Sequence, residues 1–595
     1  MSAKGVHRPV GVLTRPLSLL AAGLDRTTGW DRLPRPLGLL TLLGIRHRLR
    51  EKNLHDTGLV KPAPPRPSDV NTRTVDGSYN DLAQPSMGSV GARFGRNIPL
   101  YWAFAEREPE LLEPNPRLVS RELLTREQFI PAKTVNVLAA AWIQFEVHDW
   151  LSHETDQEAE PFELELAPGD PWEGKLTIER TLRDPTSDDF SPPAFTTYDS
   201  HWWDGSQIYG NDPELAAALR GSGGKLELDE HNLPPSKLDR FLDPKGIRGN
   251  FWLGLGLLHT LFMREHNAIV DELRARERRT WTDDELYQTA RLINAAVMAK
   301  IHTVEWTPAI IAHPTTEWGM RANWYGLVGE RVTRRVGRLG RSEAVSGIPG
   351  SPTDHHGVPY SLTEEFVAVY RMHPLIPDDY VFKSVVDNKE LAQHTFRDLG
   401  ALETRARLHE LGVANALYSF GIANPGAIKL HNYPRFLQEF KRGPDEPTLD
   451  LAATDILRIR ERGVPRYNAF RKLFHRRPIA SFDDLTPDRA TAAELARVYG
   501  DVDRLDLMIG LYAEPLPRGF AISDTAFRVF ILMASRRLKS DRFFTTDYTP
   551  ARYTQTGLDW IDDATMVKVL LRHYPELGPA LRGIDNAFKP WARVA

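Results

Sequence analysis

A tyrosine and a histidine stand three residues apart in the segment EFVAVYRMHPLIPD, and both side chains can take part in redox chemistry. Ser361 and Glu364 form a capping box that predicts the start of a helix, and Pro374 predicts its end. Tyr370 and His373 would then share one helix face, with Cβ atoms roughly 5–6 Å apart. A histidine there can bind a metal, and the phenol beside it can pass an electron to that metal. Two ordinary core residues are the alternative interpretation.

A second histidine lies in the apolar helical segment AAWIQFEVHDWLSHE. His148 continues a stripe with Trp142 and Phe145, and Gln144 lies one turn earlier on the same face. Asp149 points about 100° away around the helix and so faces a different site. A histidine on an apolar stripe is more often a core residue than a ligand, so the segment alone leaves both interpretations open.

Oxygen ligands alternate in the segment YDSHWWDGSQIYG. Ser200, Trp202 through its carbonyl, Asp204 and Ser206 offer the hard oxygen donors that Ca²⁺ prefers, and Asp149 could supply a second carboxylate. The segment therefore indicates a calcium loop. A polar turn with an aromatic anchor is the alternative.

The composition restricts how such sites can be built. The chain has 595 residues, of which 41% are hydrophobic and 26% charged, and its net charge of −4 gives no sign of nucleic-acid binding. It has no cysteine, which excludes disulfides, iron–sulfur clusters, thiolate ligation of haem and cysteine nucleophiles. Any metal must be held by the 19 histidines or by oxygen ligands. The absence of cysteine is also typical of a reducing compartment, so we expect a cytoplasmic protein.

Helical periodicity dominates from about residue 120 onward, and strand signals are sparse. No repeat or domain boundary is visible there. We therefore expect a segment over residues 1–60 followed by one large, mostly α catalytic domain over residues 61–595. The predicted helices are 133–152, 250–277, 283–306, 361–373, 403–421, 485–498, 523–539 and 564–573.

The N-terminal segment carries two short apolar runs bounded by arginines, RPLSLLAAGLD and RPLGLLTLLGIRHRLREK. Neither reaches the ~20 apolar residues that span a bilayer. The runs predict amphipathic helices in peripheral contact with a membrane surface. Helices packed on the main body are the alternative.

Several motifs together resemble the animal-type haem peroxidase and cyclooxygenase superfamily. They are FEVHDW, DGSQIYG, LHTLFMREHN and RERGVPRYNAFR, and they follow the order of that superfamily from about residue 130 to 545. VYRMHPLIPD, KIHTVEWTPAI and SRRLKSDRFFTTDYTPARYTQTGLDW are similar to motifs of the fatty-acid α-dioxygenases of plants and bacteria. The resemblance implies a mostly helical haem peroxidase (cyclooxygenase-like) fold around a buried haem, and a calcium ion in the DGSQIYG loop.

The resemblance also assigns roles around the haem. It makes His148 the distal histidine that handles peroxide protons, with Gln144 as its neighbour in the pocket. It makes His373 the proximal iron ligand. It makes Asn468 the acceptor of a hydrogen bond from the ring nitrogen of His373 that does not bind iron. Myeloperoxidase-like enzymes attach haem through an aspartate where this chain has Val147. We therefore expect haem b without a covalent link.

At the substrate, the resemblance makes Tyr370 a radical, formed after a peroxide activator oxidises the haem. The radical would take a hydrogen from the α-carbon of a fatty acid, and O₂ would add to give a 2-hydroperoxy fatty acid. His302 and Thr307 match residues at the carboxylate end, and Arg537 matches the carboxylate-binding arginine. An arginine fork suits a carboxylate, and the adjacent Arg536 is the rival.

Three other functions remain as alternatives. A peroxidase that oxidises small reductants with H₂O₂ is opposed by Val147 and by the lack of a distal arginine. A dioxygenase that attacks an interior carbon is opposed by His302 and Arg537. A haem-binding module without activity is opposed by the combined presence of the haem residues and Tyr370.

Overall fold

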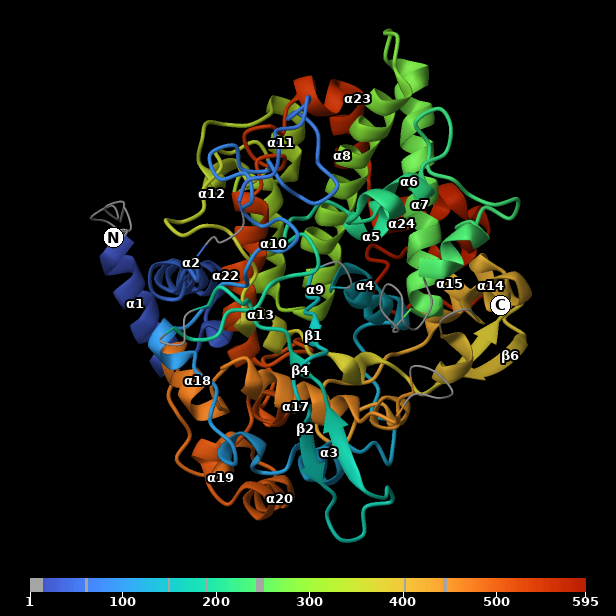
Figure 1. Cartoon of the computed structure of the whole chain (residues 1–595). Coiled ribbons are helices and arrows are strands. Elements are labelled where there is room, and N and C mark those ends of the chain that lie inside the picture. Colours follow the sequence, from blue (N-terminus) through green and yellow to red (C-terminus); the bar gives the residue numbers. More distant parts are fainter. Residues whose placement is uncertain are drawn as a thin grey trace.

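Helices make up most of the computed structural model, and this confirms the prediction of a mostly α fold (Figure 1). His148 and Asp149, two of the predicted site residues, lie outside the described residues. The structure describes residues 14–58, 62–147, 150–187, 191–241, 251–400, 403–441 and 447–595.

Three helices form the centre of the molecule. Helix α7 (Leu253–Arg276) packs along α8 (Asp283–Ile301), and α4 (Val137–Val147) packs against α7. Helix α4 is apolar around nearly its whole circumference because other elements cover it on every side. At the start of α8, Thr282 and Glu285 form a capping box. These helices are the frame on which the candidate site is built.

Helix α8 ends in a π-helical turn, η6 (His302–Trp306), which leads into the short helix α9 (Thr307–Ile310). Pro308 explains the wider turn, because it has no N–H to donate and its ring collides with the carbonyl four residues earlier. The Thr307 hydroxyl donates to the His302 carbonyl across the turn at 2.8 Å. Such single π turns often occur at functional sites.

The segment that carries Tyr370 and His373 is shorter as a helix than predicted. Helix α13 (Glu364–Val369) begins with Thr363 as its N-cap, not Ser361. It ends at Tyr370, and His373 opens a separate 3₁₀ turn, η7. The cause is Pro374, whose ring would collide with the Tyr370 carbonyl in a continuous helix. The two side chains are therefore positioned by a bend rather than by one helix face.

The remaining predicted helices are present with small changes. The predicted helix 403–421 is split by Gly412, which has a φ of 76° and opens a second helix. The other helices of eight or more residues are α3 (Pro116–Leu124), α10 (Pro314–Tyr325), α14 (Glu403–Leu411), α15 (Val413–Ile422), α17 (Leu451–Glu461), α20 (Arg489–Tyr499), α22 (Asp524–Ser540), α23 (Pro550–Asp563) and α24 (Met566–His573).

The strands form three separate antiparallel pairs that lie away from the central helices (Figure 1). Within the described residues they do not join into a larger sheet. The pairs are β1 (Thr155–Asp156) with β4 (Arg180–Thr181), β2 (Phe162–Glu165) with β3 (Lys175–Ile178), and β5 (Asp379–Lys383) with β6 (Glu390–Thr395).

The N-terminal helices α1 (Thr14–Thr27) and α2 (Arg35–Lys52) pack against each other at one side of the molecule (Figure 1). Helix α2 buries one face against α10 and α22, while Leu37 and Leu40 on its other face stay exposed. In the described part of the chain, no helix has the length and apolar character needed to cross a membrane. The segment therefore packs on the body with one face and leaves the other exposed, and membrane contact stays a prediction.

Candidate active site

A cavity separates helix α4 from the turn η7 (His373–Leu375). His373 lines one side, and Gln144 and Val147 line it from α4. The Gln144 side chain is fixed there, because its Oε1 accepts a hydrogen bond from the Trp252 indole at 2.6 Å. The other lining residues are mainly apolar: Ala140, Ile143, Leu151, Val367, Met372, Leu375 and Ile376 among them.

His373 is oriented by a buried carboxylate. Its Nδ1 lies 2.7 Å from Oδ2 of Asp455, which is buried on α17. Arg371 pairs with the other oxygen of Asp455 at 2.8 Å, and the Tyr433 hydroxyl donates to Oδ2 at 3.0 Å. Burial alone would raise the pKa of Asp455, but Arg371 and His373 outweigh it and the pKa is lowered. The carboxylate therefore holds the Nδ1 proton and leaves Nε2 able to bind a metal.

The predicted contact between Asn468 and His373 is not formed. The Asn468 amide nitrogen donates to the Ile479 carbonyl and to Asp503, and its oxygen accepts from the Ile479 N–H. Asn468 thus stabilises the loop at Ile479. Asp455 instead pairs with the His373 ring nitrogen, as had been predicted for Asn468. The sequence did hold a signal: Asp455 is an isolated acid on the apolar face of α17.

These residues fit a non-covalent haem b. The cavity is largely apolar, His373 presents a ligand nitrogen to it, and that histidine has the carboxylate partner typical of metal-bound imidazoles. Val147, at the position of the ester-forming aspartate, has no group that could form a covalent link. His148, the predicted distal histidine, follows Val147 directly and lies outside the described residues.

Tyr370 lies between this cavity and a second one. It lines the haem cavity, is 6% exposed, and stacks on Phe530 with ring centres 4.7 Å apart and planes inclined by 8°. Phe530 in turn lines the second cavity. Burial raises the pKa of Tyr370 well above 10, although Arg537 acts in the opposite direction. The phenol therefore keeps its proton at neutral pH.

The second cavity lies between α2, α10 and α22 and has a mostly apolar lining. Phe530 and Thr307 line it, as do Leu39, Leu42, Leu43, Ile311 and Met320. Its polar lining includes Arg46, which donates to Asn323 at 2.9 Å. This lining suits an apolar chain, and we name the cavity the acyl channel.

Two of the predicted carboxylate-binding residues lie in a chamber with aromatic walls. His302 is buried, accepts a hydrogen bond from the Trp142 indole at 3.2 Å and stacks on Trp306. Burial, helped by Arg537, lowers the pKa of His302 well below 6.5, so the imidazole is neutral. The Arg537 guanidinium lies 3.5 Å from the ring centre of Trp150. We name this group of buried residues, His302 and Arg537 with the tryptophans around them, the carboxylate chamber.

Arg537 and its neighbour Arg536 have different surroundings. Arg537 donates to the carbonyls of His201 and Trp202, but its Nη1 is buried and has no partner among the described residues. Arg536 instead donates through Nη2 to the carbonyls of Val358 and Pro359 and through Nη1 to a third carbonyl. The free terminal nitrogen favours Arg537 over Arg536 as the ligand of a carboxylate.

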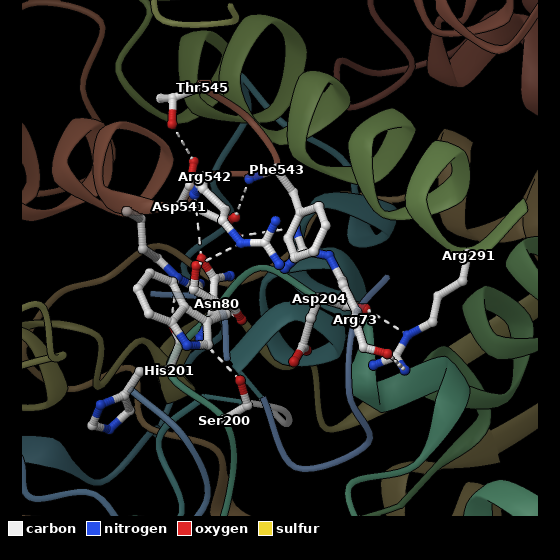
Figure 2. A network of polar contacts seen from close by, with 12 residues as sticks. Arg73, Asn80, Ser200, His201, Asp204, Arg291, Asp541, Arg542, Phe543 and Thr545 are labelled. Atoms are coloured by element: carbon white, nitrogen blue, oxygen red, sulfur yellow. Dashed lines mark hydrogen bonds and ion pairs between the residues drawn. The ribbon is translucent and has the colours of Figure 1, made fainter. Parts of the chain in front are cut away.

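The predicted calcium loop is packed around charged side chains (Figure 2). Ser200 Oγ accepts from the Trp202 N–H, and Asp204 Oδ1 accepts from the Ser206 N–H. The Trp202 carbonyl, a predicted calcium ligand, accepts a hydrogen bond from Arg537. The Asp204 carbonyl accepts a hydrogen bond from Arg291 at 3.4 Å. Within the described residues no group of three His, Cys, Asp or Glu side chains could hold a metal, and Asp149 is not among those residues.

Comparison with known proteins agrees with this arrangement. The animal haem peroxidase family model matches residues 72–582. Alpha-dioxygenase PIOX of Pisum sativum is 39% identical over 600 residues, covering 97% of this chain and 91% of that protein. Alpha-dioxygenase 1 of Arabidopsis thaliana is 37% identical, covering 98% of this chain and 94% of that protein.

Solved structures match equally well. The crystal structure of Oryza sativa fatty acid alpha-dioxygenase has a TM-score of 0.89 and 35% identity, covering 98% of this chain and 97% of that one. A tyrosine-to-phenylalanine variant of the rice enzyme, crystallised with palmitic acid, also has a TM-score of 0.89 at 35% identity, covering 99% of this chain and 98% of that one. The chain therefore belongs to the animal haem peroxidase family and, within it, to the α-dioxygenases.

Proposed function

We propose that this enzyme oxygenates fatty acids at the α-carbon and releases 2-hydroperoxy fatty acids. The observation that carries the proposal is the place of Tyr370, which lines the haem cavity and stacks on Phe530, a wall residue of the acyl channel. The name of the relatives and the palmitic acid bound to the rice variant support a fatty acid as substrate.

The haem, when bound to His373, supplies the oxidising power that turns the Tyr370 phenol into a phenoxyl radical. That radical takes one hydrogen atom from the α-carbon, so its O–H bond forms as the C–H bond breaks. The carbon radical adds O₂, and the peroxyl radical recovers the hydrogen from Tyr370. Fatty acid and O₂ thus combine into the 2-hydroperoxide without loss of an atom, and the tyrosyl radical is restored.

Attack at the α-carbon requires that the carboxylate be held beside Tyr370. Arg537 offers its free Nη1, and His302 and Thr307 lie next to each other across the π turn. A charge-assisted hydrogen bond in a site without water is strong, and it fixes the first carbon of the chain. A displacement of ~1 Å would bring a different C–H bond to the radical at a large cost in rate.

The acyl channel holds the rest of the substrate. Each methylene that leaves water for an apolar wall contributes ~0.8 kcal/mol, so a long chain gains most of its affinity there. The same walls keep water away from the radical. Chain length is then selected by how far the acyl chain reaches along α2 and α10.

We also propose a peroxide as the activator. His148 would move the protons of the peroxide, and Gln144 would stand beside it. The support is that Gln144 and Val147 line the haem cavity from α4, on the helix that leads directly into His148.

The calcium site remains a proposal. In its favour, Asp204 Oδ2 is buried and has no hydrogen-bond partner among the described residues. An ion held by Asp204 and Asp149 would tie the loop to the distal helix. We expect Asp204→Ala to lose calcium in elemental analysis, and an unchanged metal content would refute the assignment.

Peripheral membrane contact of a cytoplasmic protein is the remaining proposal. The helices α1 and α2 expose five leucines, Leu19, Leu20, Leu24, Leu37 and Leu40, and α2 also forms a wall of the acyl channel. A lipid-soluble substrate could then pass from a membrane into the channel. Replacing Leu19 and Leu20 by serine should reduce cosedimentation with phospholipid vesicles, and equal cosedimentation would contradict the proposal.

The function is tested by mixing the haem-loaded enzyme with palmitate, recording O₂ uptake and identifying the product by mass spectrometry. We expect a 2-hydroperoxide, or the aldehyde one carbon shorter that it yields on decarboxylation. Tyr370→Phe should keep the haem absorption band and lose the O₂ uptake. No uptake together with H₂O₂-driven oxidation of a phenolic dye would instead support the plain peroxidase.

A further inference from the structure

A buried carboxyl group, Glu146, belongs to no role described so far. It lies on α4 with a side chain that is fully removed from solvent. Its Oε2 accepts a hydrogen bond from the Trp203 indole at 3.0 Å. Its Oε1 is also buried and has no partner among the described residues. A buried carboxyl oxygen without a protein partner can still form a hydrogen bond with a ligand.

Glu146 lies at the carboxylate chamber. Trp203, which binds it, has its ring centre 5.0 Å from the Arg537 guanidinium carbon and 5.1 Å from the ring centre of His302. Arg537 lowers the pKa of Glu146, and Glu146 raises that of Tyr370, so the three groups are close enough to interact.

No ion pair joins Glu146 to Arg537, although opposite charges in a buried chamber attract strongly. Each of the two has one buried atom without a partner, Oε1 on the acid and Nη1 on the guanidinium. Each of the two groups can therefore form one further hydrogen bond, and a third group can bind both. A fatty acid carboxylate accepts from Arg537, but it can bind a second carboxyl only if a proton lies between them.

We propose that Glu146 is a positioning residue that binds the substrate carboxylate through one shared proton, so that the chain takes up a proton when the fatty acid binds. This inference rests on the proposed function and adds to it. The substrate carboxylate would be held on one side by Arg537 Nη1 and on the other by the Glu146 O–H. Two opposed contacts fix its rotation as well as its position, which orients one α C–H bond toward Tyr370.

The charges around the chamber support the shared proton. Arg537 is positive, His302 and the nearby His201 are neutral because burial lowers their pKa well below 6.5, and Tyr370 keeps its proton. Burial raises the pKa of Glu146 to about 7, although Trp203 and Arg537 lower it. A substrate anion beside it would raise the pKa further. Among the described groups of the chamber, Glu146 is thus the one that titrates near neutral pH.

The affinity of the enzyme for a fatty acid should therefore depend on pH, and the direction of the change follows from the proposal. Below about pH 7 Glu146 already carries its proton, and affinity is at its maximum. Above that pH the proton must be taken from solution, so affinity falls about tenfold per pH unit. The fatty acid itself is ionised throughout this range and adds no slope of its own.

The first measurement compares wild type with Glu146→Gln, which keeps an oxygen for Trp203 and offers a permanent N–H donor. We expect KM for palmitate to rise about tenfold per unit above pH 7 in wild type and to stay flat in the variant. Equal slopes in the two proteins would overturn the proposal and assign the titration to another group.

Glu305→Gln is the matched control. Glu305 is also a buried carboxyl whose pKa burial raises to about 7, but it accepts from the Met566 N–H outside the chamber. Its variant should keep the wild-type slope. A flat profile in Glu305→Gln would show that general loss of a buried acid, rather than contact with the substrate, removes the dependence.

A binding measurement separates this inference from the proposed function. In the Tyr370→Phe background, calorimetry of decanoate at pH 8 in two buffers of different ionisation enthalpy counts the protons taken up. We expect close to one proton per bound decanoate, and none when Glu146→Gln is added. Absence of proton uptake with intact binding would refute only the role of Glu146, not the proposed function. Lack of α-oxygenation by wild type would refute the proposed function and leave this count valid.

Discussion

The two sides of Tyr370 differ in how completely their polar groups are paired. On the haem side, both oxygens of Asp455 are engaged, one by His373 and one by Arg371. In the carboxylate chamber, Arg537 and Glu146 each keep a buried atom without a partner. The charged groups of the first region are ion-paired within the protein, whereas Arg537 and Glu146 of the second have no ion-pair partner among the described residues.

This difference has a physical reason. A metal ligand must be held in one tautomer and one orientation, so its partners are fixed by the protein. A substrate site must instead gain interactions on binding, and polar atoms left without partners provide that gain. The contrast predicts that mutations on the haem side act on the cofactor, and mutations in the chamber act on the substrate.

The largest effect is expected from His373→Ala. Removal of the ligand nitrogen should abolish haem retention and reduce oxygenation by more than about 1,000-fold, since the radical is no longer formed. The Soret band after gel filtration measures the retained haem. Full retention of haem would show that the iron is held by another residue, and the comparison between the two regions would then fail.

Arg537→Gln should come next. Loss of the charged donor is expected to raise KM for palmitate by about 100-fold, corresponding to roughly 2–3 kcal/mol, while the Soret band stays unchanged. Arg536→Gln is the control, because its terminal nitrogens already bind backbone carbonyls, and it should alter stability rather than KM. A rise of KM only in the Arg536 variant would reverse the assignment.

Asp455→Asn should have a smaller effect confined to the haem side. An amide accepts the hydrogen bond of His373 but does not carry its charge, so the imidazole becomes a weaker donor to the iron. We expect a higher haem reduction potential and about 10–100-fold lower activity, with KM for palmitate unchanged. A potential equal to that of wild type would show that Arg371 already neutralises the carboxylate.

The smallest effect concerns stability. The pKa of Glu146 is raised in the folded state, so its contribution is full below about pH 4.5 and is lost as pH rises through about 7. Wild type should therefore lose about 1 kcal/mol more than Glu146→Gln between pH 6 and pH 8. Urea unfolding at the two pH values measures the difference. An identical loss in both proteins would mean that the carboxyl is not desolvated.

The sequence was sufficient for the long helices, whereas the single helix expected to carry Tyr370 and His373 was wrong. Long apolar periodicity determines helices such as α7 and α22 without reference to the rest of the chain. The pair is local, since Pro374 acts on its immediate neighbours. The N-cap was predicted wrongly because two adjacent candidates, Ser361 and Thr363, have nearly equal capping ability, and the early bend decides between them.

The residues that the sequence did not reveal are those whose partners are distant along the chain. Asp455 meets His373, and Glu146 meets Trp203, only after the helices have packed. Neither acid stands in a motif with a recognisable spacing. Arg537 differs from Arg536 only in which atoms remain free, and this too is a property of the packed structure.

The position of α2 restricts how the enzyme can be engineered. Leu39, Leu42 and Leu43 of this helix form part of the wall of the acyl channel, so the N-terminal segment is not a dispensable appendage. A shortened form starting after Lys52 would leave the channel as an open trough on the surface. Such a form would still bind haem, but it would lose its preference between short and long substrates and expose an aggregation-prone apolar face.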